Sequence, residues 1–395
     1  MSVAETQVAI VGAGPAGLLL SHLLDREGVA SVVLEKRSQL YVERRVRAGV
    51  LEQGTVDLLC AAGLGERLRR EALVHHGIEL RFDGDAHRIP LSELTGGRAI
   101  TIYGQQEIVK DLIAARRAAG GSVHFEIDDV RVAGIDTDSP SLHYVQAGRQ
   151  TELRCAFIAG CDGHHGICRD AIPSGSLRVY EREYPFGWVG ILAGVPPSTD
   201  EVVYASHERG LAMHSMRSPE LSRLYLQCGP ADVIEQWPDE RIWGELHRRL
   251  ATRDGWVLKE GPVLEKSITA LRSFVVEPMQ YGRLFLAGDA AHIVPPTGAK
   301  GLNLAVADVR ILAEALVEWF HKGRRELLDG YSERCLRRVW RVQQFSSWMT
   351  SVLHRPSEDA SGFERRLQLA QLAYVTRSRA AATSLAENYV GLELV

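Results

Sequence analysis

Short apolar runs alternate with a helical pattern at the start of the chain. Residues 7–11 form an apolar run that is followed directly by glycine, which is typical of a buried parallel strand. A helical pattern over residues 15–27 and a second apolar run at residues 31–35 come next. This β-α-β order predicts a parallel sheet, because parallel strands need a crossover connection. We also expect a helix over residues 105–119 and a strand over residues 153–159.

The pattern changes near residue 178. From there to about residue 230, short segments alternate apolar and polar positions and are separated by turn residues, which predicts antiparallel sheet. A short apolar strand returns at residues 284–288, and residues 303–320 read as a long helix. Most of the remaining chain up to residue 386 also has a helical pattern, so we expect helices to fill the C-terminal region.

Gly12, Gly14 and Gly17 form a G-x-G-x-x-G motif between the first strand and its helix. The first glycine permits a tight turn, the second lets the backbone approach a pyrophosphate, and the third lets the helix pack closely on the strand. The helix N-terminus offers unpaired N–H groups to phosphates. Glu35 ends the second strand and can accept hydrogen bonds from a ribose. The motif predicts a dinucleotide site, but it does not separate FAD from NAD.

These elements together predict the fold class and the domains. We expect an α/β protein (α+β overall) with a Rossmann-like dinucleotide-binding domain over residues 1–178, completed by the strand and helix near residues 284–320. An antiparallel-sheet domain over residues 179–283 would be inserted into it, and residues 321–395 would form a helical interface region.

Composition excludes several classes of protein. The chain has 46 Lys plus Arg and 50 Asp plus Glu, which gives a formal net charge of −4 and no basic excess for holding nucleic acid. No apolar run reaches the roughly 18 residues of a membrane span, and no basic segment precedes the first apolar run as in a secretory signal. The six cysteines lack a C-x-x-C pair and indicate reduced thiols. We therefore expect a cytoplasmic protein without nucleic-acid or membrane partners.

Two further segments are candidates for binding the same cofactor. In residues 282–304, Asp289 follows a strand and is placed to accept a ribityl hydroxyl of a flavin. The helix after this loop would point its N–H groups at the pyrimidine edge of an isoalloxazine and favour the reduced form. A plain strand-loop-helix joint is the alternative. Asp162 with Arg169 could order a loop near pyrophosphates, and a simple turn explains the same residues equally well.

A third group of residues suits a carboxylate ligand. Ser215 and Arg217 are two apart in one predicted strand, as are Arg223 and Tyr225 in the next, so each pair shares a face. An antiparallel arrangement would bring the hydroxyl, guanidinium and phenol together, and arginine binds carboxylates bidentately. A solvated sheet face explains the spacing as well. No HExxH, His-x-His or cysteine cluster and no G-x-S-x-G motif occurs, so we expect neither a metal site nor a serine nucleophile.

The motifs GAGPAG (12–17), the Asp162 segment and GDAAHIVPPTGAKGLN (288–303), in this order, resemble the single-component flavoprotein aromatic hydroxylases. The resemblance extends over nearly the whole chain to those members that act on 4-hydroxybenzoate, through RAGVLEQG (47–54), YGQ (103–105), YPFGW (184–188), EKSI (265–268), LRSFVVEPMQ (271–280), MTSVLHR (349–355) and AENYVGL (386–392). It implies an FAD enzyme that uses NADPH or NADH and O₂.

The implied reaction is hydroxylation of 4-hydroxybenzoate at C3 to 3,4-dihydroxybenzoate through a flavin C4a-hydroperoxide, in a homodimer. Two alternatives stay open. One is a hydroxylase of another substituted benzoate, such as 4-aminobenzoate. The other is a non-catalytic FAD-binding electron-transfer protein.

The resemblance also implies roles for single residues. For FAD it implies Gly12, Gly14, Gly17, Glu35, Arg47, Gln105, Asp162, Asp289, Lys300, Leu302 and Asn303. For the nicotinamide nucleotide it implies Lys36, Arg37, Tyr41, Arg47, His165 and Arg169, and for flavin movement Arg223 and Trp188. Residues 36–41 depart from the best-known pattern of the family, which leaves NADPH against NADH open.

The implied substrate residues are of two kinds. Ser215, Arg217 and Tyr225 would bind the carboxylate, and Tyr204, Tyr389, the carbonyl of Pro296 and His75 would accept and relay the proton of the substrate hydroxyl. Such a relay makes chemical sense, because a phenolate accepts electrophilic oxygen better than a phenol does. Without the resemblance, the two tyrosines fit packing residues and His75 fits the protein surface.

Overall fold

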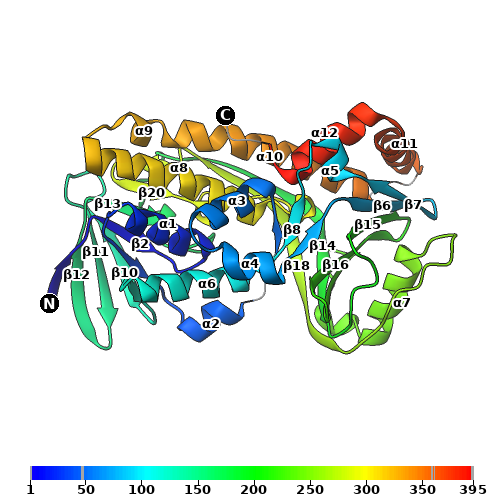
Figure 1. Cartoon of the computed structure of the whole chain (residues 1–395), viewed down its shortest axis with the longest axis horizontal. Coiled ribbons are helices and arrows are strands. Elements are labelled where there is room, and N and C mark those ends of the chain that lie inside the picture. Colours follow the sequence, from blue (N-terminus) through cyan, green and yellow to red (C-terminus); the bar gives the residue numbers. More distant parts are fainter. Residues whose placement is uncertain (1, 46–48, 357–358, 360, 393–395) are drawn as a thin grey trace.

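The computed structural model describes residues 2–45, 49–356, 359 and 361–392 (Figure 1). Over these residues the strands form four sheets, of six, eight, four and three strands, and helices cover them. The predicted α/β class, with mixed α+β organisation, is confirmed. In the part of the chain that is described, no helix is both long and apolar enough to cross a membrane.

The six-stranded sheet is the core of the dinucleotide unit. Its order is β19-β20-β13-β2-β3-β9, and all pairs except β19 with β20 are parallel. The strands are β2 (Val8–Val11), β3 (Ser31–Leu34), β9 (Ser122–His124), β13 (Phe157–Gly160), β19 (Gln280–Tyr281) and β20 (Leu284–Leu286). The late strand β20 pairs with β13, so the chain returns to this sheet after a long excursion.

One predicted strand is wrong in extent. Residues 153–159 do not form one strand, because β12 (Arg149–Arg154) ends in the four-stranded sheet and β13 begins only at Phe157 in the six-stranded one. Between them the N–H groups of Ala156 and Phe157 both donate to the carbonyl of Gln7. This bond to a distant residue turns the chain from one sheet to the other.

Helices flank the six-stranded sheet, with α1 (Pro15–Arg26) in contact with both α6 (Gln105–Ala118) and α8 (Gly301–Lys322) (Figure 1). The helices predicted over residues 105–119 and 303–320 are thereby confirmed within one or two residues. The smaller helices of this unit are α2 (Gln39–Arg44), α3 (Gln53–Ala61), α4 (Gly65–Glu71) and α5 (Leu91–Leu94). Two small sheets complete the unit. The four-stranded sheet contains β1 (Ser2–Glu5), β10 (Asp128–Ala133), β11 (Ser141–Gln146) and β12. The three-stranded sheet contains β4 (Val50–Leu51), β5 (Leu73–His75) and β8 (Ile100–Ile102).

The eight-stranded sheet has the order β21-β18-β14-β17-β16-β15-β6-β7. Its strands are β6 (Ile78–Phe82), β7 (Asp85–Ile89), β14 (Arg178–Ala193), β15 (Val202–His207), β16 (Gly210–Ser218), β17 (Leu221–Cys228), β18 (Val263–Glu277) and β21 (His292–Ile293). The predicted antiparallel pairing of β15, β16 and β17 is confirmed.

Two strands of this sheet come from the segment that we assigned to the dinucleotide domain. β6 and β7 precede residue 178, and β6 pairs in parallel with β15. The sheet is therefore mixed, and the boundary at residue 178 does not separate the two units. Parallel pairing between segments more than a hundred residues apart leaves no local turn signal that a sequence pattern could show.

Opposite faces of the eight-stranded sheet pack against different helices. α7 (Asp239–Leu250) covers the face that carries Val203, Ala212 and Leu224. The other face carries Tyr204 and Met213, and it packs with residues of the C-terminal helices. These helices are α10 (Tyr331–Leu353), α11 (Phe363–Arg377) and α12 (Arg379–Val390), whereas Leu328 of the short helix α9 (Glu326–Asp329) belongs to the core of the dinucleotide unit. The face toward α10 and α12 is the one that concerns the site.

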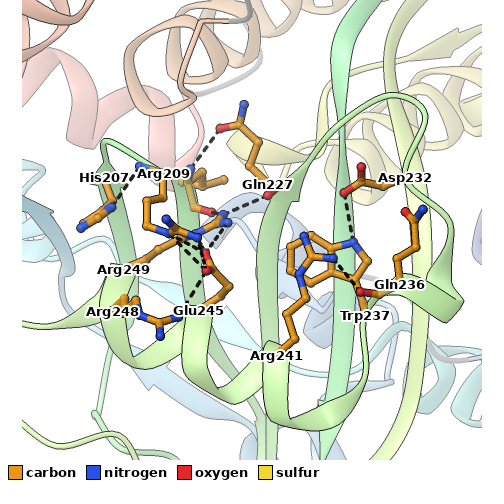
Figure 2. Close-up of polar contacts among 11 residues, drawn as sticks. His207, Arg209, Gln227, Asp232, Gln236, Trp237, Arg241, Glu245, Arg248 and Arg249 are labelled. Atoms are coloured by element: carbon orange, nitrogen blue, oxygen red, sulfur yellow. Dashed lines mark hydrogen bonds and ion pairs between the residues drawn. The ribbon is translucent and has the colours of Figure 1, made fainter.

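α7 is held to its face by a buried carboxylate. Glu245 accepts hydrogen bonds from Arg209 and Arg249 (Figure 2). The guanidinium of Arg249 also donates to the carbonyls of Leu211 and Gln227, at 3.2 and 2.9 Å. Burial would raise the pKa of Glu245, but the two arginines lower it to about 2. The charged network ties α7 to β16 and β17 at the level of Gln227.

α10 belongs to two cores at once. Cys335 and Val339 in its first half are buried in the core of the dinucleotide unit. Met349 and Leu353 in its second half are buried against the eight-stranded sheet. We predicted residues 321–395 as a helical interface region, and within that region this helix connects the two units from inside.

Candidate active site

The glycine motif forms the turn between β2 and α1. Gly12 has a φ of +105°, and a Cβ there would lie 2.4 Å from the carbonyl oxygen of Cys161. A Cβ on Gly17 would lie 2.0 Å from the carbonyl oxygen of Gly12, whereas a Cβ on Gly14 would meet no heavy atom within 4 Å. Gly12 and Gly17 are thus required by packing, and the space over Gly14 fits a pyrophosphate approaching the helix N-terminus.

Glu35 holds the motif in place. Its carboxylate accepts the N–H of Ala13 and the N–H of Arg37, each at 2.8 Å. The carboxylate is therefore oriented by the backbone of both neighbouring segments. Each oxygen keeps lone pairs for a ribose hydroxyl, since a carboxylate offers about four acceptor positions.

The roles of Gly12 and Gly14 can be distinguished experimentally. We expect Gly12→Ala to lower the thermal stability of the protein even without cofactor, because the added Cβ collides with the backbone of Cys161. Gly14→Ala should leave the stability of the cofactor-free protein unchanged and weaken FAD binding about tenfold or more, because its Cβ enters the pyrophosphate space. Differential scanning fluorimetry and FAD titration measure the two effects. Equal behaviour of the two variants would contradict this division of roles.

The Asp162 loop lies against the same turn. One carboxylate oxygen of Asp162 accepts the N–H of Cys168 at 2.9 Å, and the other is buried without a partner among the described residues. Burial raises the pKa of Asp162. Arg169 donates to the carbonyls of His164 and Ala290. Both residues order the loop, as one of our interpretations had it, and the unpartnered oxygen is available to a donor on a ligand.

α8 presents its N-terminus at the carboxyl end of β20. Asp289 is exposed in a short 3₁₀ turn, Gly288–Ala290, directly after this strand. Leu302 is buried in the first turn of α8, and a Cβ on Gly301 would meet open space. The free N–H groups and the positive dipole end of this long helix suit an anionic flavin edge, as predicted.

The side chains of Lys300 and Asn303 form hydrogen bonds within the protein. The ammonium of Lys300 is buried and donates to Glu52 at 2.6 Å and to the carbonyl of Tyr389 at 2.8 Å. Burial would raise the pKa of Glu52, but Lys300 and Arg338 lower it, so the carboxylate is ionised. The buried charges are paired, which is the condition under which they are tolerated.

The side-chain amide of Asn303 joins α8 to the segment before α3. Its oxygen accepts the N–H of Glu52 and the hydroxyl of Thr55, and its nitrogen donates to the carbonyls of Val50 and Ala299. With these four bonds the amide positions the segment that leads from residue 49 to α3. Gln105 lies half-buried at the start of α6, and the predicted FAD and nicotinamide residue Arg47 lies outside the described residues.

The residues predicted for the nicotinamide nucleotide lie on the surface. Lys36 and Arg37 are exposed between β3 and α2, Tyr41 is exposed on α2, and the guanidinium of Arg37 lies 5.1 Å from the ring centre of Tyr41. His165 is exposed in the Asp162 loop. The two groups flank the carboxyl-end edge of the six-stranded sheet, which is where such sheets bind ligands.

The predicted carboxylate group does assemble on β16 and β17. Ser215 pairs with Arg223 across the two strands. Arg217 approaches the hydroxyls of Ser215 at 3.4 Å and Tyr225 at 3.3 Å, and Arg223 approaches Tyr225 at 3.4 Å. Two guanidinium groups therefore converge on one phenol.

Electrostatics at this group favours an anionic ligand. Burial would raise the pKa of Tyr225, but Arg217 and Arg223 lower it. Burial lowers the pKa of Arg217. Nε of Arg217 and one terminal nitrogen of Arg223 are buried without a hydrogen-bond partner in the described part of the chain. A carboxylate would compensate both the charge and these unused donors.

Tyr204 and Tyr389 form a buried pair. Their hydroxyl oxygens are 2.6 Å apart, and the hydroxyl of Tyr204 also donates to the carbonyl of Thr297 at 3.1 Å. Burial raises the pKa of both tyrosines well above its usual value. Both hydroxyls are therefore neutral near pH 7, and a proton can pass along the pair.

Tyr204 and the carboxylate group share one face of the sheet, and Tyr389 bonds to Tyr204 from α12. Tyr204 lies opposite Met213, which lies opposite Tyr225 on the next strand. Two strand spacings, about 10 Å, thus separate the backbones of Tyr204 and Tyr225. Met213 lies between them on the same face and is buried.

The carbonyl of Pro296, predicted to accept the substrate hydroxyl, accepts the N–H of Ala299 in the 3₁₀ turn Pro296–Gly298 and keeps a second lone pair. The carbonyl to which Tyr204 donates is that of the next residue, Thr297. His75 is not on the surface but is 1% exposed at the end of β5. Its ring nitrogens have no partner among the described residues, and burial lowers its pKa to about 4.

Trp188 is buried on β14, and its indole N–H donates to Nε2 of His354 at 2.7 Å. Its ring centre lies 4.9 Å from that of Tyr225. Sequence reasoning missed His354, Thr297 and Glu52 as parts of the site. Their signal was present only in the quoted segments that carry the resemblance, because none of the three has a motif of its own.

Comparison with known proteins places this fold and site in a class. The model of the FAD binding domain family matches residues 5–346. The chain is 49% identical over 392 residues to the p-hydroxybenzoate hydroxylase of Acinetobacter baylyi, covering 99% of this chain and 96% of that protein. It is 28% identical to the rifampicin monooxygenase of Streptomyces venezuelae, over 82% of this chain and 67% of that protein.

Solved structures agree on the fold. The p-nitrophenol 4-monooxygenase PnpA of Pseudomonas putida superimposes with a TM-score of 0.84 at 21% identity and covers both chains completely. The chain is thus an FAD-binding protein of the aromatic hydroxylase type. Within this class it belongs to the p-hydroxybenzoate hydroxylase family, which confirms the resemblance noted in the sequence.

Proposed function

We propose that the protein hydroxylates 4-hydroxybenzoate at C3. In the overall reaction, 4-hydroxybenzoate, O₂, NAD(P)H and a proton give 3,4-dihydroxybenzoate, water and NAD(P)⁺. The observation that carries the proposal is the sheet face that bears Arg217 on β16, Arg223 on β17 and, on β15, Tyr204, whose hydroxyl bonds to that of Tyr389 on α12. The 49% identical p-hydroxybenzoate hydroxylase supports the same substrate.

The proposed FAD site combines the glycine turn with the N-terminus of α8. Gly14 would leave room for the pyrophosphate, Glu35 and Asp162 would offer acceptors, and Asp289, in the turn after β20, would accept a ribityl hydroxyl. When bound, FAD takes a hydride from the nicotinamide nucleotide and supplies an activated oxygen atom from O₂. We propose Lys36, Arg37, Tyr41, His165 and Arg169 for the nicotinamide nucleotide, since four of them are cationic or can become so.

In the proposed mechanism the protein binds, orients and deprotonates the substrate. Arg217, Ser215 and Tyr225 hold the carboxylate, so that the hydroxyl at the other end of the ring meets Tyr204. Tyr204 accepts the proton of this hydroxyl and passes its own to Tyr389 through the 2.6 Å hydrogen bond. The ring then carries phenolate character at the carbon next to the oxygen. The carbonyl of Pro296 would accept a hydrogen bond from the same substrate hydroxyl. Tyr389 would release its own proton outward to His75 at the end of the path, and Arg223 and Trp188 would serve flavin movement.

We propose a cytoplasmic homodimer. The six cysteines are all free, which suits a reducing compartment. On α11, the side chains of Phe363, Leu367 and Tyr374 are 62, 51 and 57% exposed at helical spacing. Such an apolar stripe suits contact with a second copy.

Purified protein should be yellow and should oxidise NADPH or NADH faster when 4-hydroxybenzoate is added. Oxygen uptake and chromatography should show one 3,4-dihydroxybenzoate per nicotinamide oxidised. Benzoate, which lacks the hydroxyl, should give no hydroxylated product, and 4-aminobenzoate tests the nearest alternative substrate. Binding of FAD without any substrate-stimulated oxidation would favour an electron-transfer protein and overturn the proposal.

A further inference from the structure

His354 follows the last residue of α10 and is 2% exposed. Its ring lies nearly parallel to two rings of β14, within 11° of each. The ring centres are 4.5 Å from that of Phe186 and 5.8 Å from that of Trp188. No motif of the sequence pointed to this residue, and the proposed mechanism does not use it.

The hydrogen bonds of His354 fix one tautomer. Nδ1 lies 2.9 Å from the carbonyl oxygen of Thr350, so Nδ1 must carry the hydrogen. Nε2 is then the acceptor of the indole N–H of Trp188, at 2.7 Å. Burial lowers the pKa of His354 to about 3, so the ring is neutral at working pH and the acceptor is always present.

The backbone around His354 is anchored from two sides. The side-chain nitrogen of Gln368, on α11, donates to the carbonyls of Ser351 and His354. Gln227, on β17, accepts the N–H of Arg355 and donates to its carbonyl, each at 2.9 Å (Figure 2 shows Gln227 beside the α7 network). The imidazole is therefore fixed in position, and the indole that bonds to it is fixed in turn.

Trp188 transmits this position to the carboxylate group. Its ring contacts the ring of Tyr225, whose hydroxyl meets Arg217 and Arg223. We propose that His354 is a positioning residue that holds Trp188, and through it Tyr225, in the orientation that binds the substrate carboxylate. This inference rests on the proposed function of that group, and it assigns to the end of α10 a role in substrate binding.

Two amide substitutions separate the two hydrogen bonds. A glutamine at position 354 can place an acceptor near the position of Nε2, whereas an asparagine places its amide near Nδ1 and loses the bond to Trp188. We expect His354→Gln to bind 4-hydroxybenzoate as the wild type does. We expect His354→Asn to bind it about tenfold more weakly, the effect of one lost buried hydrogen bond. The turnover number at saturating substrate should change much less than KM.

The dissociation constant is measured from the change of the flavin spectrum when substrate is titrated without NAD(P)H. His214→Asn is the matched control, because His214 on β16 is also a buried histidine whose pKa burial lowers to about 4, and it bonds to Ser198 and Thr199 rather than to the site. It should bind substrate normally. Equal weakening in His214→Asn and His354→Asn would reduce the effect to general destabilisation and overturn the proposal.

A double variant tests the route through Trp188. Trp188→Phe should weaken substrate binding by the same factor as His354→Asn, and the double variant should be no weaker than either alone. Additive effects would overturn the proposal. Should His354→Asn not fold, an unchanged dissociation constant in Trp188→Phe would overturn it instead. If the wild type fails to bind 4-hydroxybenzoate, the proposed function fails; if it binds and the variants match it, only this inference fails.

Discussion

Tyr204→Phe should bind 4-hydroxybenzoate with nearly unchanged affinity and yet hydroxylate it at least about a hundredfold more slowly, the size of a lost acid–base step. The variant removes the hydroxyl that bonds to Tyr389 at 2.6 Å, so the substrate proton has no acceptor. NAD(P)H oxidation should continue and O₂ should leave as H₂O₂. The ratio of product to oxidised nicotinamide, measured with a peroxide assay, reports the effect.

The pH dependence of this variant gives a second reading. A free phenol ionises near pH 10, so hydroxylation by Tyr204→Phe should rise with pH as the substrate ionises without help. The tyrosine pair in the wild type stays neutral over this range, because burial raises the pKa of both residues. Tyr184→Phe is the control, since its hydroxyl on β14 bonds to Ser273 and Ser347 and should be dispensable. Hydroxylation at the wild-type rate in Tyr204→Phe would contradict the relay.

Arg217→Ala should weaken binding of 4-hydroxybenzoate by about 2–5 kcal/mol, because the carboxylate would be buried without its main partner. The affinity of Arg217→Lys should lie between those of the wild type and Arg217→Ala, since lysine keeps the charge and loses the bidentate geometry. Titration of the flavin spectrum measures both constants. Arg178→Ala, an exposed residue at the start of β14, should bind substrate like the wild type. An unchanged dissociation constant in Arg217→Ala would contradict the carboxylate assignment.

The sequence patterns predicted those turns, strands and helices that depend on residues close together in the chain. The β2-α1 turn, the antiparallel run of β15 to β17 and α8 follow from glycine spacing, alternation and helical periodicity, and the structure contains all of them. The face shared by Ser215, Arg217 and Tyr225 also follows from a period of two residues. These features depend on residues close to one another in the chain.

Contacts between distant segments could not be predicted in this way. Three contacts each connect positions about ninety or more residues apart. They are the pairing of β6 with β15, the hydrogen bond from Tyr204 to the carbonyl of Thr297, and the hydrogen bond from Trp188 to His354. A single sequence carries no periodic signal for such pairs. The burial of His75 was also missed, because His75 ends β5, which pairs with β8 in a sheet built from separate parts of the chain.

Because α10 contributes residues to both cores, the rotation of its second half relative to its first determines how the two binding units are aligned. One residue inserted near its middle would turn everything beyond it by about 100°. Thr350, whose hydroxyl bonds to that of Thr297, and His354 would then face away from the sheet, and so would Met349 and Leu353 of the second core. The length of α10 therefore sets how the dinucleotide unit is aligned with the substrate-binding face of the eight-stranded sheet.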